Sequence, residues 1–349
     1  MAYHSRSFAI YCARLIPSCR RVQYPPIFKQ GSLEGITMLK ILRCSYFLLG
    51  ILLVLSSGSC NGRGIVATPT LLATATSRPV NTPVAPTSTA SPTPTQTVTP
   101  MPDLGSRWTS PVDGMEMLYV PAGDFSMGTE VYDADDEKPA HVVHLSAFWI
   151  DLTEVTNAMY QLCVQAKVCV APTSSASYSY TSYYDNPQFA DYPVIFVSWV
   201  DARDYCSWAG ERLPSEAEWE KAARAADGRM FPWGEQAPNC SLANFTTNGR
   251  TCVGDPARVG SYPGGASPYG VLDMAGNVME WVKDVYDPLY YRRSPQNDPP
   301  GSDKSDYRVV RGGSWYSDGK SLRATNREYE NPFNTYDTLG FRCARSAAP

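Results

Sequence analysis

The feature that most constrains the fold is a long tract of threonine, proline, alanine and serine. It runs from Val66 to Pro102 and carries one charged residue, Arg78. Dense proline excludes helix and disfavours sheet, so we expect a disordered, extended linker over residues 61–107. A proline-rich ligand motif is the alternative use of such a tract. Ordered structure is therefore expected to begin near Trp108.

The segment before the linker has the organisation of an export signal. Residues 38–60 combine a basic start, the apolar run Tyr46–Leu55 and small residues before Cys60. The apolar run is shorter than the roughly 20 residues of a membrane-spanning helix. We interpret it as a lipoprotein signal with Cys60 as the lipidated residue, and plain secretion is the alternative because Ser57 replaces the usual leucine. The predicted location is the extracytoplasmic face of the cell envelope.

Residues 1–37 precede this signal and have no targeting function there. We therefore expect Met38 to be the true start and residues 1–37 to be a mis-called N-terminal extension. The formal net charge of −4 gives no polyanion-binding footprint, so nucleic acid is not an expected partner. Eight Trp and 22 Tyr indicate a globular part whose loops are pinned by aromatic packing.

Local patterns after residue 107 predict a mixture of strands and helices. Met115–Met127 alternates like a strand and turn, and His141–Ile150 is expected as a second strand. The acidic stretch Asp133–Lys138 between them is interpreted as a solvated turn rather than a metal site. His141 and His144, three residues apart on a strand, would point to opposite faces, so we expect structural histidines.

Three helix starts can be recognised from their capping residues. Thr156 is a candidate N-cap for a helix reaching Cys163, and Ser198 caps a second helix that Gly210 ends. Ser215 and Glu218 form a capping box that opens a third. After Phe231 the chain is dominated by loop-forming residues, so the pattern is α+β with much irregular structure.

Four segments carry a family resemblance. RLPSEAEWEKAAR (212–224), YGVLDMAGNVMEW (269–281), RVVRGGSW (308–315) and GFRCAR (340–345) resemble, in order and spacing, the formylglycine-generating enzyme or sulfatase-modifying factor family. The resemblance covers residues 108–345. It implies a single mixed α+β domain related to the C-type lectin fold, loop-rich, with short strands and about three helices.

The same resemblance identifies what is missing. In the family the glycine-glycine-serine turn is followed by two copper-binding cysteines five residues apart, and the matching positions here are Ser317 and Leu322. Neither offers the soft sulfur ligand that Cu(I) needs. Copper and formylglycine-generating oxidase activity are therefore not expected, although Ser314 matches a serine near the reaction centre. The alternative is a family oxidoreductase or protein-modifying enzyme with a metal mechanism not visible in the sequence.

Six cysteines lie in the domain, and spacing alone cannot choose among their fifteen pairings. The resemblance implies a bridge between Cys206 and Cys343, whose family counterparts are disulfide-bonded. This leaves Cys163 near Cys169 and Cys240 near Cys252, so we predict those two bridges as well. A redox or metal-binding thiol pair is the alternative.

The resemblance also implies structural calcium. One site would use the side chains of Asp273 and Glu280 with the carbonyls of Gly276 and Val278; a second would use Asn244 and the carbonyl of Phe245. Oxygen ligands of this kind suit Ca²⁺. Turns with surface carboxylates are the alternative interpretation.

The segment 316–337 is rich in adaptable contact residues, among them Tyr316, Asp318, Asn334 and Tyr336. Some family members use this segment as a variable ligand-binding face, and ordinary loop composition is the alternative. We therefore expect a surface-anchored binding or assembly module that takes a protein or small-molecule ligand outside the membrane. The oligomeric state remains open.

Overall fold

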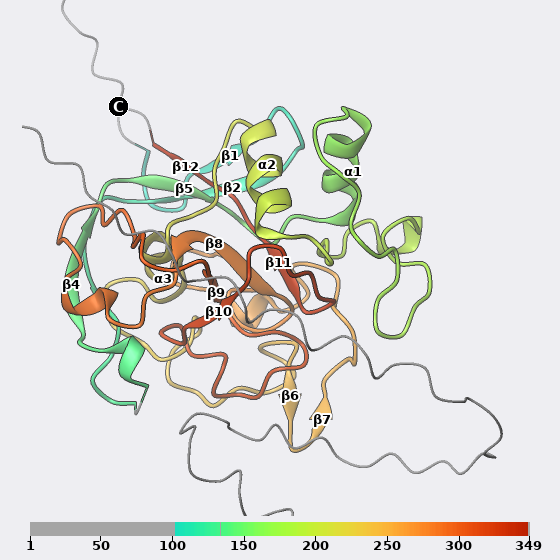
Figure 1. Cartoon of the computed structure of the whole chain (residues 1–349). Helices are drawn as coiled ribbons and strands as arrows, with labels where there is room; N and C mark the ends of the chain where they lie inside the picture. Colours follow the sequence, from blue (N-terminus) through green and yellow to red (C-terminus); the bar gives the residue numbers. More distant parts are fainter. Residues whose placement is uncertain (1–101, 133, 348–349) are drawn as a thin grey trace, which may run out of the picture. The chain divides into compact units, whose positions relative to one another are not determined.

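Figure 1 shows the computed structural model of the chain, in which residues 102–132 and 134–347 are described. The predicted signal segment, Cys60 and almost all of the linker lie outside these residues. Within them the fold is α+β, with three helices, twelve short strands and long loops between them, as predicted.

The first sheet joins the two ends of the domain. Its order is β1–β2–β5–β12, and every neighbouring pair is antiparallel. The strands are β1 (Arg107–Thr109), β2 (Glu116–Val120), β5 (Phe148–Asp151) and β12 (Ala344–Ser346). Because β12 pairs with β5 and β2 pairs with β5 on the other side, the first and last strands of the domain share one sheet.

The second sheet brings the motif segments together. Its order is β10–β9–β8–β11, formed by β8 (Met279–Val285), β9 (Arg308–Arg311), β10 (Glu328–Glu330) and β11 (Leu339–Phe341). Strand β8 pairs with β9 antiparallel and with β11 parallel. Three of the four motifs, far apart in the sequence, therefore lie on adjacent strands.

Two antiparallel ribbons complete the strands. One is β3 (Gly123–Met127) with β4 (His141–Leu145), and the other is β6 (Thr246–Thr247) with β7 (Arg250–Thr251). The prediction of one strand over His141–Ile150 was wrong, because the chain changes sheet between β4 and β5. Ser146 lies at that change, where its N–H and hydroxyl both donate to the Asp298 carboxylate.

The three helices begin at the predicted caps. They are α1 (Asn157–Gln165), α2 (Trp199–Trp208) and α3 (Glu216–Arg224). Thr156 caps α1, and Ser198 and Ser215 form full capping boxes that satisfy free N–H groups at the starts of α2 and α3. No helix in the described part of the chain is long and apolar enough to span a membrane.

The core has two main apolar clusters. The first packs α3 against β2–β5 and includes Trp219, and the second packs α1 and α2 against β8 and β11 around Trp281. Both tryptophan side chains are fully buried. Within residues 102–132 and 134–347 the 3-10 turns are Asp135–Glu137, Pro187–Phe189, Pro263–Gly265 and Tyr290–Arg292.

The acidic turn is not uniformly solvated, which corrects the sequence interpretation. Glu137 is 1% exposed. Its carboxylate accepts hydrogen bonds from both terminal nitrogens of Arg323, at 2.7 and 2.8 Å, and from the Thr325 hydroxyl at 2.7 Å. A partner 186 residues away cannot be read from local composition. The turn is therefore an anchor for the C-terminal loop.

Candidate functional site

The glycine-glycine-serine turn follows directly from β9. Gly312 and Gly313 have φ of 92° and 68°, and a Cβ on Gly313 would lie 3.0 Å from the Ser321 carbonyl. Only glycine adopts this conformation without strain. The turn buries Ser314, whose N–H donates to the Ser317 hydroxyl at 3.0 Å, and the two hydroxyl oxygens are 3.1 Å apart.

The two positions predicted to correspond to the family's thiol pair take part in packing and hydrogen bonding. Leu322 is 0% exposed and belongs to an apolar cluster with Phe231, Ala243, Phe245 and Ala275. Ser317 bonds Ser314 through its side chain and accepts the Thr246 N–H through its carbonyl at 2.9 Å. A hydroxyl and an apolar side chain supply no soft donor for Cu(I).

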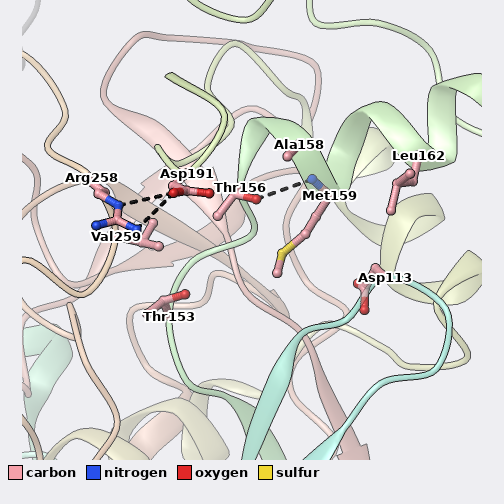
Figure 2. Close-up of a pocket in the computed structure, with 9 residues that line it drawn as sticks. All are labelled: Asp113, Thr153, Thr156, Ala158, Met159, Leu162, Asp191, Arg258 and Val259. Atoms are coloured by element: carbon pink, nitrogen blue, oxygen red, sulfur yellow. Dashed lines mark hydrogen bonds and ion pairs between the residues drawn. The ribbon is translucent and has the colours of Figure 1, made fainter. Parts of the chain in front are cut away.

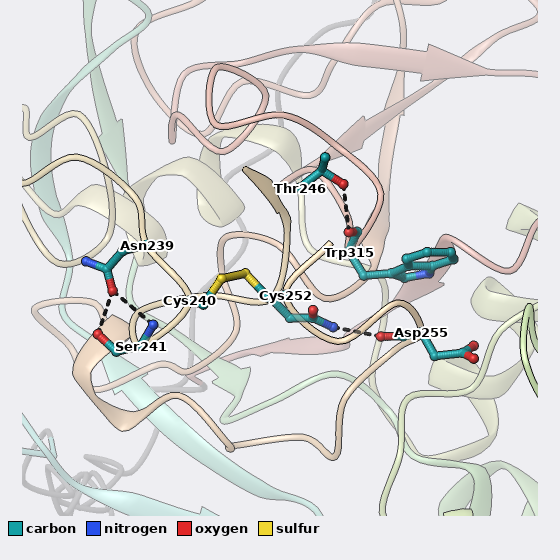
Figure 3. The surroundings of a disulfide bond; sticks show 8 residues. Asn239, Cys240, Ser241, Thr246, Cys252, Asp255 and Trp315 are labelled. Carbon is teal, nitrogen blue, oxygen red and sulfur yellow. Dashed lines mark hydrogen bonds between the residues drawn. A yellow bond between two sulfur atoms is a disulfide. The ribbon is translucent and has the colours of Figure 1, made fainter. Parts of the chain in front are cut away.

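Each cysteine of the domain lies in a disulfide. The bridges are Cys163–Cys169, Cys206–Cys343 and Cys240–Cys252, which are the three pairings expected. Figure 3 shows the third bridge near Trp315 and Asp255. The described residues therefore hold no free thiol that could replace the absent pair.

An exposed group of aromatic side chains lies beside the turn. Trp315 is buried, and its ring lies 5.6 Å from Tyr178 and 5.4 Å from Tyr316. Tyr178 is 72% exposed and Tyr316 is 67% exposed. We call Tyr178, Trp315 and Tyr316 the aromatic face. The Trp315 Nε1–H donates to the Asp337 carbonyl at 3.1 Å, which joins the two ends of segment 316–337.

The other predicted contact residues have mixed roles. Tyr336 is exposed, but Asn334 donates to Glu330 at 2.7 Å and to the Tyr336 hydroxyl at 2.9 Å. Asp318 accepts the N–H groups of Lys320 and Ser321 and so stabilises its own turn. Tyr316 and Tyr336 are therefore the members of this set with the most freedom to contact a partner.

Two surface cavities are formed by the residues near the turn and along α1. One, of about 330 Å³, adjoins the turn and is lined by Tyr132, Met230, Phe231, Gly319, Lys320 and Arg323. The other, of about 450 Å³, lies along α1, where apolar Met159 and Leu162 face the Asp191–Arg258 ion pair (Figure 2).

Buried ion pairs lie next to the glycine-glycine-serine turn, because Arg311 directly precedes it. Arg311 is fully buried and donates to Glu220 at 2.6 Å, and Arg327 donates to both oxygens of Glu216 at 2.7 and 2.9 Å. Burial alone would raise the pKa of Glu216, but the charges of Arg327 and Arg311 lower it below its ordinary value. The sequence reading missed these pairs, since their partners are far apart along the chain.

The predicted calcium turn is built around Gly276. Its φ is 80°, and a Cβ there would lie 2.4 Å from the Asn244 carbonyl oxygen. Asp273 and Asn277 also have positive φ and are buried. Asp273 accepts the Gly260 N–H at 2.6 Å. The turn at 273–277 is thus pressed against Asn244, which joins the two predicted calcium segments.

In this turn Glu280 forms an ion pair with Arg342. Its carboxylate accepts two hydrogen bonds from Arg342, both 2.7 Å, and one from the Trp219 indole at 2.8 Å. The carboxylate accompanying Asp273 is instead Glu154, whose Oε2 is buried without a partner. Burial, followed by the Asp273 charge, raises the pKa of Glu154 well above its ordinary value.

In the second predicted calcium segment, Asp255 lies next to Asn244, and the sequence alone did not identify it. The Asn244 side-chain amide donates to the Asp255 carbonyl at 2.8 Å, so the two residues are neighbours (Asp255 is seen in Figure 3). Both are buried, and Oδ1 of each has no partner. Two orphaned oxygens suit a hard cation such as Ca²⁺. Asp255 follows a poorly patterned loop, so no local signal marked it.

The histidines lie apart from these groups. His141 Nδ1 lies 3.0 Å from the Pro139 carbonyl, and His144 Nδ1 lies 2.6 Å from Asp124. Among the described residues, neither belongs to a cluster of potential metal ligands.

Comparison with known proteins agrees with this geometry. The model of the sulfatase-modifying factor enzyme 1-like domain matches residues 106–347. The serine/threonine-protein kinase pkn1 of Chlamydia pneumoniae is 36% identical over 247 residues, covering 66% of this chain but 38% of that protein. The chain thus spans well under half the length of this relative.

Two further relatives match over most of their length. The formylglycine-generating enzyme of Streptomyces coelicolor is 34% identical and the inactive C-alpha-formylglycine-generating enzyme 2 of Mus musculus is 32% identical. Each match covers 66% of this chain, with 89% and 86% of the relative.

Among solved structures, PvdO from Pseudomonas aeruginosa has a TM-score of 0.59 and 28% identity, covering 70% of this chain and 99% of that one. The chain therefore belongs to the family of the sulfatase-modifying factor enzyme 1-like domain.

Proposed function

We propose that this chain is a surface-anchored binding or assembly module without formylglycine-generating activity. The observation that carries the proposal is the replacement of the thiol pair: Leu322 is part of an apolar cluster, and Ser317 is bonded to Ser314. The family includes a relative named as inactive. A site whose former ligand positions serve packing keeps the fold but lacks the oxidase chemistry.

The aromatic face supports the binding part of this proposal. Tyr178 and Tyr316 are exposed, and the ring of each packs against the buried Trp315. Exposed aromatic side chains with few rotatable bonds give large contact area at low entropic cost. The neighbouring cavity at Gly319 and Lys320 offers a recess for a partner's side chain.

The anchoring part rests on the predicted signal, Cys60 and linker. A flexible linker of about 40 residues spans roughly 35 Å, and proline extends it further. That reach suits contact with a protein or small-molecule ligand beyond the lipid headgroups. Labelling cells with a radioactive fatty acid should mark the wild-type chain and leave Cys60→Ser unlabelled; label on both would contradict the anchor.

A photo-crosslinking amino acid at position 316 tests the contact face in the full-length protein. We expect a discrete crosslinked product in intact cells that disappears when Tyr178→Ala and Tyr336→Ala are added. The same probe at Val142, an exposed apolar position on β4, should give no such product. Equal crosslinking from both positions, or a product unaffected by the substitutions, would contradict the proposal.

We further propose a structural calcium ion at the Asn244–Asp255 pair. The support is the two unpartnered buried oxygens and the pressed turn at Gly276. A cation held only by the folded state raises the melting temperature with concentration. Asp255→Asn should abolish most of that rise, whereas Asp303→Asn, in an exposed loop, should leave it intact. An unchanged rise in Asp255→Asn would exclude this site.

A further inference from the structure

A group of carboxylates lies beside the Cys206–Cys343 disulfide, away from the calcium segments discussed above. Asp151 ends β5, Glu211 follows α2, and Asp113 lies in the loop between β1 and β2. One carboxylate oxygen of Asp151, one of Glu211 and the Cys343 sulfur all lie within 4.8 Å of one another. The Cys343 sulfur is part of the disulfide, so it borders the group without being a candidate ligand.

The hydrogen bonds of this group leave several oxygens unused. Asp151 is 1% exposed, and its Oδ2 accepts the Cys343 N–H at 2.7 Å while its Oδ1 has no partner. Both carboxylate oxygens of Glu211 are buried and unpartnered as well. Buried oxygens of this kind are rare in native proteins and require a partner or an ion.

The charges of Arg342 and Arg345 only partly offset the charge of the group, because the pKa values of Asp151 and Glu211 both stay raised. Arg342 is committed to Glu280 and donates to the Asp151 carbonyl rather than to its carboxylate. Arg345 lies with its guanidinium 4.1 Å from the Trp108 ring. The third carboxylate, Asp113, accepts the Tyr205 hydroxyl at 2.6 Å. The carboxylates of Asp151 and Glu211 therefore lie buried close together, and the charge of the half-buried Asp113 acts on both. Such a group is costly unless a cation is present.

We propose that Asp151 and Glu211, assisted by Asp113, bind a hard divalent cation of the calcium class. The spacing fits, because two oxygens that each lie ~2.3–2.6 Å from one Ca²⁺ ion are at most about 5 Å apart. The ligands come from β5, from the end of α2 and from the β1–β2 loop. The ion would therefore reinforce the elements that the disulfide already joins.

Burial is consistent with this proposal. Burial, followed by the charge of Asp113, raises the pKa of Glu211 to about 8, and burial followed by the charge of Glu211 raises the pKa of Asp151. A proton shared between the two carboxyls is the competing arrangement, and it gives the opposite result in the test below.

The test counts ions on the full-length protein by equilibrium dialysis against calcium after chelation. We expect Glu211→Gln and Asp151→Asn each to bind one ion fewer per chain than wild type. Glu116→Gln, which removes an exposed carboxylate paired with Arg107, should bind the full number. Combining Glu211→Gln with Asp255→Asn should remove two ions, which distinguishes this site from the Asn244–Asp255 pair.

Melting temperatures give a second readout whose sign is informative. In chelator above about pH 8, where Glu211 is ionised, Glu211→Gln should melt above wild type because it removes an uncompensated buried charge and loses no hydrogen bond. In millimolar calcium the order should reverse. Wild-type ion counts in Glu211→Gln, or a variant that melts higher in both conditions, would overturn the proposal in favour of a shared proton.

Terbium luminescence on the otherwise unmodified chain covers the case in which a carboxylate variant does not fold. The Tyr205 hydroxyl bonds a proposed ligand, so excited Tyr205 should sensitise a bound lanthanide. Tyr205→Phe should lose part of the emission, while Tyr307→Phe should retain it. Equal emission from both variants would also overturn the proposal.

Discussion

At the scale of single residues, Gly276 makes the closest backbone approach among the described glycines with positive φ. A Cβ there would lie 2.4 Å from the Asn244 carbonyl oxygen, whereas a Cβ on Gly249, with a similar φ of 74°, meets nothing within 4 Å. We expect Gly249→Ala to cost roughly 1 kcal/mol from backbone conformation alone. Gly276→Ala should cost on the order of 3 kcal/mol or more because a backbone atom must also move. Equal free energies of unfolding for the two variants would contradict this account.

A substitution of Glu280 tests whether its carboxylate serves as an ion-pair partner or as a metal ligand. Its carboxylate is buried against Arg342 and Trp219, so Glu280→Gln leaves the arginine charge buried without a counter-ion. Breaking such a pair typically costs about 3–5 kcal/mol. We expect this loss with and without calcium, measured by denaturant unfolding. A loss confined to calcium-containing buffer would show that Glu280 is a ligand after all.

Asp284 accepts a hydrogen bond from the first residue of helix α3. Its Oδ2 accepts the Glu216 N–H at 2.8 Å, and burial, followed by the charge of Glu216, raises its pKa to about 7. The unfolded value is about 3.9. Between these values the folded chain holds a proton that the unfolded chain has released, so this group's contribution to stability declines as pH rises.

The variant Asp284→Asn keeps the hydrogen-bond acceptor and removes the titration. Relative to wild type it should gain stability progressively from about pH 4 to about pH 7 and hold that gain above. Guanidinium unfolding across this range measures the difference. A difference that is constant with pH would contradict the assigned cause.

At the scale of elements, the disulfides should contribute different amounts to the free energy of unfolding. Cys206–Cys343 has a sequence separation of 137 and joins α2 to the segment before β12, whereas Cys163–Cys169 has a separation of 6. In the chain-entropy model these bridges contribute about 5 and about 2 kcal/mol. Paired serine substitutions should therefore destabilise the domain much more at the first bridge. Equal losses, measured by denaturant unfolding, would show that chain entropy is not the main term.

The elements also show how far local sequence signals reach. The caps Thr156, Ser198 and Ser215 depend on the next three residues, so their prediction succeeded. Glu137 and Glu280 depend on arginines 186 and 62 residues away, and no local pattern identifies such partners. The break between β4 and β5 was missed for the same reason, because it depends on which sheet each strand joins.

At the scale of the whole molecule, the order of the sequence motifs identified the family, and the second sheet brings the motif segments together. The segments ending at Trp281, Trp315 and Arg345 were recognised separately, and β8, β9 and β11 place them side by side. The substitutions at Ser317 and Leu322 were visible in the sequence. That Leu322 is sealed in an apolar cluster follows only from the fold.

The central claim is that this fold no longer carries out the oxidase reaction, and peptide mass measures it most directly. The full-length protein, loaded with copper, is incubated with a sulfatase-type cysteine peptide beside the Streptomyces coelicolor enzyme as a positive control. We predict that the control converts the peptide to the aldehyde while this protein leaves its mass unchanged. Conversion by this protein would contradict the account.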